Sequence, residues 1–148
     1  MTNFANRGKY AESQVKTLLK KLEAANCTHH RFPDKRAGSF VTAPADFLLL
    51  QEGKLRLLEV KEVQHQTRLP YKNLEQGQLA RMLMWQAAGA SCWVLVYHTP
   101  ANVWRLLPVD YFKNRQKTTD TGKPVGSWDL NDIPTQTLTE AFGLIKNA

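Results

Sequence analysis

The sequence predicts an α/β domain with a central mixed β-sheet flanked by α-helices. Three observations lead to this fold class: an amphipathic helix near the N-terminus, two neighbouring apolar runs joined by a glycine turn, and a second helix followed by buried strands. The 148 residues include 43% hydrophobic side chains, which is enough to form one core. We therefore expect a single domain over residues 1–148 with the element order α, β, β, α, β, β.

The first predicted helix covers residues 8–23. Val15, Leu19 and Leu22 recur at three- and four-residue spacing, and lysines occupy the opposite face. Glu12 lies three residues before Val15, and two interpretations of its place are open. Either it points along the apolar stripe, where a buried carboxylate needs a partner or a metal, or it lies at the edge of the stripe, where the helix dipole favours an acid in the first turn.

Two predicted strands follow at residues 46–50 and 55–63. Four residues that include Gly53 join them, which suits a tight turn between antiparallel strands. Because side chains alternate along a strand, Glu59 and Lys61 point to the same face, together with the apolar residues that precede them.

The remaining segments are assigned from apolar periodicity and from the positions of glycine and proline. A glycine at position 89 ends the second helix, and prolines at positions 33, 44 and 70 indicate loops. We expect an exposed basic loop over residues 31–45, a connection over 64–73, a helix over 74–88, strands over 92–97 and 103–107, a polar stretch without regular structure beyond 112, and a short helix over 137–145.

The charge balance points to a polyanionic partner. Lys and Arg number 20 against 13 Asp and Glu, which gives a net charge of +7 and a pI near 9.6. A solvated surface that is basic for no functional reason is the alternative.

The sequence also indicates a compartment. Cys27 and Cys92 lack the paired spacing of a disulfide framework or a four-ligand zinc site, so we expect reduced thiols. The first residues contain no apolar segment typical of a secretory signal, and no run reaches the roughly 18 apolar residues of a membrane span. We expect a cytoplasmic protein, bacterial or phage-encoded, with no membrane partner.

Three acids and one lysine form the candidate chemical site. Asp46 at the start of one strand and Glu59 on its hairpin partner can converge, and Glu12 can approach from the packed helix. Carboxylates are the hard ligands that Mg²⁺ requires, and Lys61 is placed to orient water or offset phosphate charge. A structural salt bridge is the alternative, since Glu-x-Lys is common in strands.

Two short motifs carry a family resemblance. Pro44-Ala45-Asp46 followed by Glu59-Val60-Lys61 resembles the signature of the PD-(D/E)XK nucleases, and the α-β-β-α-β order resembles their core. Within that superfamily the chain is most similar to the RecU and Hjc Holliday-junction resolvases. The segments that carry this similarity are Asn6-Arg7-Gly8-Lys9 with Glu12, Gly38-Ser39-Phe40, Leu69-Pro70-Tyr71-Lys72-Asn73 with Gln78, and residues 104–112.

The resemblance implies a restriction-endonuclease-like core over about residues 6–112, with a C-terminal extension over 113–148. It implies an endonuclease dependent on Mg²⁺ (or Mn²⁺), a homodimer whose two sites nick a four-way junction symmetrically. Glu12, Asp46 and Glu59 would bind the metal, and Lys61 would be the catalytic lysine. Ala45 between Pro44 and Asp46 departs from the tightest form of the motif.

Basic residues near the predicted site are candidate phosphate contacts, which position DNA without reading its sequence. Phe32, Phe40 and Tyr71 lie among them and either stack on unpaired bases or pack at the base of a loop. The candidate DNA-binding residues are Lys9, Arg31, Lys35, Arg36, Arg68 and Lys72. The resemblance to the resolvases implies two more candidates near the scissile phosphate, Arg7 and Gln78.

Two other functions use the same residues. A related nuclease acting on flaps, mismatches or duplex ends would keep the four site residues and differ in residues 31–43 and in oligomeric state. A non-catalytic DNA-binding module would hold those four residues for structural reasons alone.

Overall fold

The computed structural model describes residues 9–32, 43–113 and 126–148. Its helices are α1 (Lys9–Leu22), α2 (Gln76–Ala87) and α3 (Leu138–Asn147), with short 3₁₀ turns at Glu23–Ala25, Tyr71–Asn73 and Val109–Lys113. Its strands are β1 (Thr28–Arg31), β2 (Phe47–Gln51), β3 (Lys54–Val63), β4 (Arg68–Pro70), β5 (Ser91–His98), β6 (Val103–Pro108) and β7 (Ser127–Asp129).

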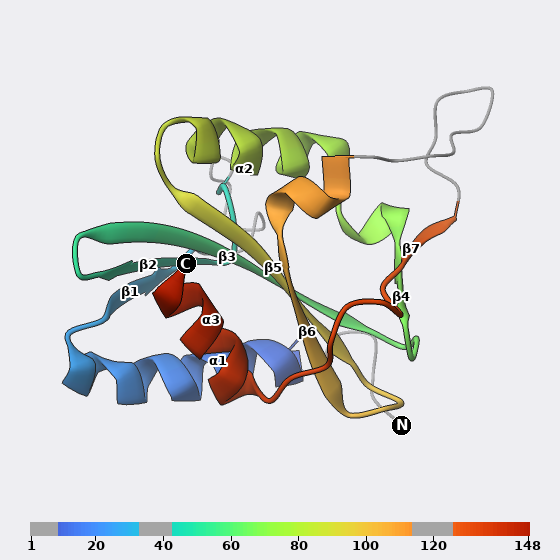
Figure 1. Cartoon of the computed structure of the whole chain (residues 1–148), viewed down its shortest axis with the longest axis horizontal. Coiled ribbons are helices and arrows are strands. Elements are labelled where there is room, and N and C mark those ends of the chain that lie inside the picture. The colour runs from blue at the N-terminus through green and yellow to red at the C-terminus, as the bar shows by residue number, and fades with distance from the viewer. Residues whose placement is uncertain (1–8, 33–42, 114–125) are drawn as a thin grey trace.

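The central feature is a five-stranded sheet in the order β1-β2-β3-β5-β6 (Figure 1). Strands β3 and β5 run parallel, and the other neighbouring pairs are antiparallel. Helix α2 makes the crossover that a parallel pair requires. The predicted α/β class with a mixed sheet is therefore confirmed. Strands β4 and β7 pair separately, in a two-stranded sheet.

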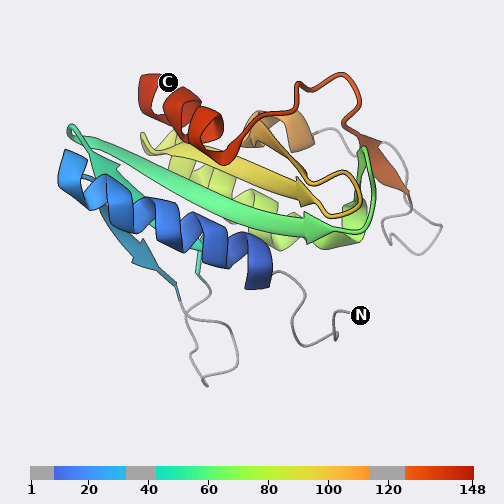
Figure 2. The same ribbon diagram turned by 90° about the horizontal axis from the view of Figure 1, so that it is seen from below.

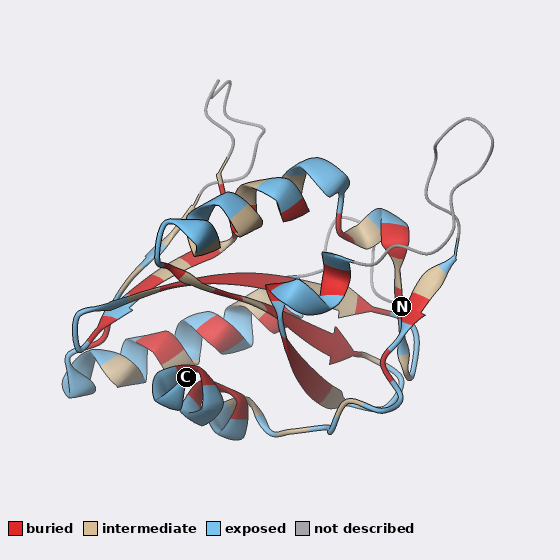
Figure 3. Ribbon diagram, turned by 45° about the horizontal axis from the view of Figure 1, so that its top comes forward, coloured by how far each residue is buried: buried red, intermediate tan, exposed pale blue. Residues whose placement is uncertain are grey.

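Helices cover both faces of the five-stranded sheet: α2 on one face, α1 and α3 together on the other (Figures 1 and 2). Alternation along β3 divides its side chains between the two resulting cores. Leu57 packs in the core with Met82 of α2, whereas Leu58 packs with Val15 of α1. Figure 3 shows the central strands almost wholly buried between these helix layers.

Most predicted elements are present at nearly the expected positions. The first helix, the hairpin, the second helix, two later strands and the C-terminal helix all form. Gly53 lies in the hairpin turn at φ 74° and Gly89 follows α2 at φ 117°, both in the left-handed region that glycine enters without strain. In the parts of the chain that the structure describes, no helix has the length and apolar character needed to cross a membrane.

Three strands lie where we expected none. Residues 28–31, which end at the start of the predicted loop, form β1; the predicted connection contains β4; and the polar stretch predicted to be irregular contains β7. Each is short and pairs with another segment, β1 with β2 and β4 with β7. Such strands depend on tertiary pairing more than on their own composition, which explains the error. Residues 33–42 and 114–125 lie outside the described part of the chain.

Candidate active site

An open cleft of about 430 Å³ lies beside the part of β3 that follows Leu58, close to the start of β2 and the first turn of α1. It contains all four residues of the predicted chemical site. Its lining comprises Glu12, Asp46, Glu59, Val60, Lys61, Glu62, Val63, Gln64, His65, Pro70, Lys72 and Asn73.

The hairpin brings Asp46 and Glu59 together. Phe47 pairs with Leu58, so antiparallel register sets Asp46 one step further on, opposite Glu59. An Oδ2 oxygen of Asp46 accepts a hydrogen bond from the backbone N–H of Val60 at 2.9 Å. This bond fixes the carboxyl group beside β3 instead of leaving it in solvent.

The surroundings of Asp46 disfavour its negative charge. Burial is the main cause, and Glu59 and then Glu12 add repulsion, so that the pKa of Asp46 rises to about 8. The hydrogen bond from Val60 and the positive charge of Lys61 act in the opposite direction without cancelling the rise. A nearby divalent cation would remove this penalty, which is the behaviour expected of a ligand site.

Glu59 and Lys61 share one face of β3, as the strand alternation predicted. The Lys61 Nζ lies 2.9 Å from Oε2 of Glu59. Glu59 is only 3% exposed, and its other oxygen, Oε1, is buried with no hydrogen-bond partner among the described residues. Buried carboxylate oxygens rarely lack a partner, so this atom is an acceptor available to a ligand.

Glu12 reaches the cleft from the opposite layer of the fold. It lies in the first turn of α1, where Ala11, Val15 and Leu19 form the buried stripe, so it occupies the edge of that stripe. Its Oε2 accepts hydrogen bonds from Nη2 of Arg31 at 2.7 Å and from Nε at 3.2 Å. The structure thus places Glu12 at the edge of the stripe, as the second interpretation has it, and gives the carboxylate the charged partner that the first interpretation requires.

The cleft offers carboxylate oxygens, the ligands that Mg²⁺ prefers. No three Asp, Glu, His or Cys side chains in the described ranges 9–32, 43–113 and 126–148 are grouped closely enough to hold an ion, and Glu12 is bound to Arg31. Asp46 and Glu59 form a pair of neighbouring carboxylates, and Oε1 of Glu59 has no partner in these ranges. Mg²⁺ is commonly held by one or two carboxylates together with water and substrate phosphate. The pair therefore fits Mg²⁺.

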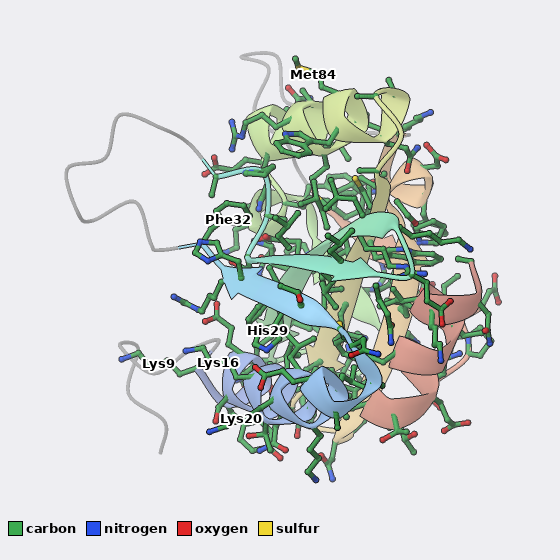
Figure 4. All side chains as sticks on the ribbon, turned by 90° about the vertical axis from the view of Figure 1, so that its left-hand side faces the viewer. Lys9, Lys16, Lys20, His29, Phe32 and Met84 are labelled. Atoms are coloured by element: carbon green, nitrogen blue, oxygen red, sulfur yellow. The ribbon has the colours of Figure 1, made fainter. Side chains whose placement is uncertain are left out.

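The predicted DNA-binding residues lie at different distances from the cleft. Lys72 lines it, and Lys9 begins the helix that carries Glu12, with its side chain exposed (Figure 4). Arg31, at the end of β1, binds Glu12. Arg7, Lys35 and Arg36 lie outside the described residues.

Two further candidates are not among the residues that line the cleft. Arg68 in β4 donates to Oγ of Ser127 at 3.3 Å and lies 3.7 Å from a carboxylate oxygen of Asp129. Gln78 lies on α2 and is half-buried. A role of either residue in DNA binding stays a prediction.

The aromatic candidates favour packing over base stacking. Tyr71 is buried, and its ring lies edge-on to Trp128 with centroids 4.6 Å apart. Phe32 is half-buried, packs against the core that contains α2 and lies edge-on to His30. Phe40 lies outside the described residues. Both cysteines are free and buried, and burial raises the pKa of each thiol, consistent with unreactive side chains.

Sequence reasoning missed one charged residue of the cleft, Glu62. It follows Lys61 directly, and strand alternation assigns it to the opposite face of β3. The sequence signal is indirect: the N–H groups in the first turn of a helix require acceptors from elsewhere, but no spacing identifies Glu62 as one of them.

Comparison with known proteins identifies the fold. No protein-family model matches the sequence, and no curated protein matches it. Hjc from Archaeoglobus fulgidus, a Holliday junction resolvase, is similar in structure with a TM-score of 0.51 and 18% identity, over 84% of this chain and 98% of that one. A bacterial homing endonuclease is similar with a TM-score of 0.42 and 12% identity, over 82% and 85% of the two chains. The likeness to Hjc shows that this chain has a restriction-endonuclease-like fold.

Proposed function

We propose that this chain is a metal-dependent, structure-specific DNA endonuclease that resolves four-way junctions by paired, symmetric nicks. The observation that carries the proposal is the hairpin site, where Asp46 and Glu59 are neighbours and Lys61 forms an ion pair with Glu59. One buried oxygen of Glu59 has no partner in the described ranges of the chain. A structural salt bridge alone would explain Lys61 and Oε2, but it would leave Oε1 of Glu59 costly and unexplained.

The residues divide the work of phosphodiester hydrolysis. Asp46 and Glu59 supply the oxygen ligands for Mg²⁺ or Mn²⁺, with Glu12 as a third candidate ligand. A divalent cation held there supplies positive charge at the phosphate and makes a water more acidic. Lys61, held by Glu59, orients the attacking water or offsets the charge that develops on the phosphate.

The choice of substrate rests on the fold and on charge. The neighbour with the higher structural similarity, Hjc, is a Holliday junction resolvase, and the net charge of +7 favours a polyanion. A four-way junction has two-fold symmetry, so a homodimer would present one cleft to each of two opposing strands. Lys9 and Lys72 would contact phosphates on either side of the cleft.

The proposal is tested with labelled synthetic four-way, flap and linear DNA, with Mg²⁺ or with a chelator. We expect cleavage of the four-way junction in Mg²⁺ only, at paired sites that a ligase can reseal. The variant Asp46→Asn should lower the rate by at least about 100-fold, since even indirect partners of a metal site contribute 10–100-fold.

Asp132→Asn is the matched control, because Asp132 is exposed and does not line the cleft. Junction cleavage that survives Asp46→Asn would exclude the proposed site. Equal cleavage of linear duplex would keep the nuclease and reject the junction specificity, whereas binding without any cleavage would favour a DNA-binding module.

A further inference from the structure

The start of α1 has a polar group that water cannot reach. Ala11 is the third residue of the helix, so its N–H has no acceptor four residues earlier within α1. Ala11 is also 0% exposed, which excludes solvent as a partner. The N–H instead donates to Oε1 of Glu62 at 2.9 Å, an acceptor 51 residues away in the sequence.

Glu62 is well placed for this contact. It belongs to β3, whose neighbouring even-numbered residues Leu58 and Val60 pack in the core with α1. Glu59 and Lys61 take the other face of the same strand. Neighbouring residues of β3 therefore contact different parts of the protein. Glu59 and Lys61 lie on the face of the hairpin carboxylates, and Glu62 contacts the helix that carries Glu12.

A carboxylate suits this position for two reasons. It accepts a hydrogen bond from an N–H that would otherwise be unsatisfied, and its charge is stabilised by the positive end of the helix dipole. The contact also lies at the cleft, because Glu62 and Glu12 both line the cleft.

The consequence concerns Glu12, the residue that follows Ala11. Its backbone is tied to β3 through the bond between Ala11 and Glu62, and its side chain is tied to β1 through Arg31. Without the first of these ties, the first turn of α1 would fray, and Glu12 would no longer be held near Asp46 and Glu59.

We propose that Glu62 is a positioning residue: its bond to the N–H of Ala11 fixes the start of α1 against β3 and thereby places Glu12 at the metal-binding cleft. This inference rests on the proposed function for the role of Glu12. The tie itself concerns only the protein and can be measured without metal or DNA.

The test compares Glu62→Ala, which removes the acceptor, with Glu62→Gln, which keeps an oxygen acceptor and removes the charge. Amide hydrogen exchange at Ala11 and Glu12 reports the tie, and titration of the intact protein with Mn²⁺ reports the cleft. In Glu62→Ala we expect exchange at both amides to be at least about tenfold faster and Mn²⁺ affinity to fall by about 10–100-fold, the usual effect of losing an outer partner of a metal site.

Glu62→Gln should stay within about threefold of the native protein in both measurements, because its amide oxygen can accept the same bond. Glu52→Ala is the matched control, since it removes one carboxylate from the exposed turn at the far end of the same hairpin. If Glu62→Ala does not fold, Glu62→Met replaces it, because methionine has similar length and no strong acceptor.

The possible results separate the alternatives. Equal loss of Mn²⁺ affinity in the Gln and Ala variants would overturn the inference, because Glu62 would then act through its charge or as a ligand. Unchanged exchange at Ala11 in the Ala variant would overturn it as well. Failure of the native protein to bind Mn²⁺ would instead reject the proposed function, and the exchange rates would still decide whether Glu62 holds α1.

Discussion

Two buried charges on the sheet differ in how completely they are satisfied. Arg105 on β6 is 6% exposed and donates from Nε to Ile133 O and from Nη1 to Gln66 O, each at 3.0 Å. Glu59 on β3 is 3% exposed, yet among the residues that the structure describes only its Oε2 has a partner. The arginine ties two connecting segments to the sheet, whereas Oε1 of the glutamate contacts no donor in those residues. Arg105 therefore serves the structure, whereas Glu59 keeps an oxygen that the metal of the proposed function could use.

The largest expected effect is a loss of cleavage rate when Glu59 is substituted. Glu59→Gln should lower junction cleavage in Mg²⁺ by at least about 100-fold, because it removes the negative charge that would bind the metal and that pairs with Lys61. The free energy of unfolding should change by no more than about 1 kcal/mol, since the same substitution also ends the repulsion with Asp46. Cleavage assays and urea denaturation measure the two effects. A large loss of stability with cleavage retained would make Glu59 structural.

The satisfied charge should show the reverse pattern. Arg105→Met leaves the carbonyls of Ile133 and Gln66 without their donors, and each buried orphan costs about 1–3 kcal/mol. We expect a loss of about 2–5 kcal/mol in the free energy of unfolding. Arg68→Met, at a side chain that is 53% exposed, is the control and should cost less than about 1 kcal/mol. Similar losses in both variants would contradict the role assigned to Arg105.

A third buried group, the imidazole of His98, should make the stability of the protein depend on pH. His98 is 0% exposed; its Nδ1 lies 2.8 Å from His65 O, and its Nε2 has no partner in the described part of the chain. Burial lowers the pKa of His98 in the folded protein, so the unfolded chain binds the proton more readily. Stability is therefore fully present above pH 6.5 and decreases as the pH falls below it, by up to about 1.4 kcal/mol per pH unit.

Unfolding measured between pH 5 and 8 checks this sign. His98→Gln should flatten the decrease below pH 6.5, whereas His29→Gln, at a half-buried site beside Glu23, serves as the histidine control. An unchanged pH profile in His98→Gln would show that other groups cause the loss of stability in acid.

The smallest expected effect is on the salt dependence of DNA binding, and it compares two basic residues, Lys72 and Arg68. Lys72 lines the cleft, and among the described residues no ion pair involving it is found, whereas Arg68 lies near Asp129. Lys72→Ala should reduce the slope of log affinity against log salt by about 0.9 for a junction. Arg68→Ala should reduce it by less, because Asp129 already offsets part of its charge. Equal reductions of the slope in the two variants would show that DNA also contacts β4.

The features that the sequence predicts correctly depend on residues that lie close together in the chain. Gly53 between two apolar runs specified the hairpin, and strand alternation then placed Glu59 and Lys61 on one face. The pairing of Asp46 with Glu59 followed from the same hairpin. These relations need only a few neighbouring residues, so they can be derived without knowledge of the rest of the chain.

The contacts that escaped prediction all link distant segments. Arg31 was expected in a loop, but it ends a strand held by β2 and binds Glu12. Glu62 was correctly assigned to the face of β3 opposite Glu59, but its partner, a backbone N–H of α1, was not predicted. Neither contact has a sequence spacing from which it could be inferred, because each depends on how helix and sheet pack together.

The acidic side chains that line the cleft come from both sides of the five-stranded sheet. Asp46 and Glu59 belong to the face packed against α2, and Glu12 belongs to the helix on the other face. A cation or phosphate that engaged both sets would act as a clamp between two separately packed cores. Occupancy would then protect α1 from local opening, so that ligand binding could be followed from a helix on the far side of the sheet.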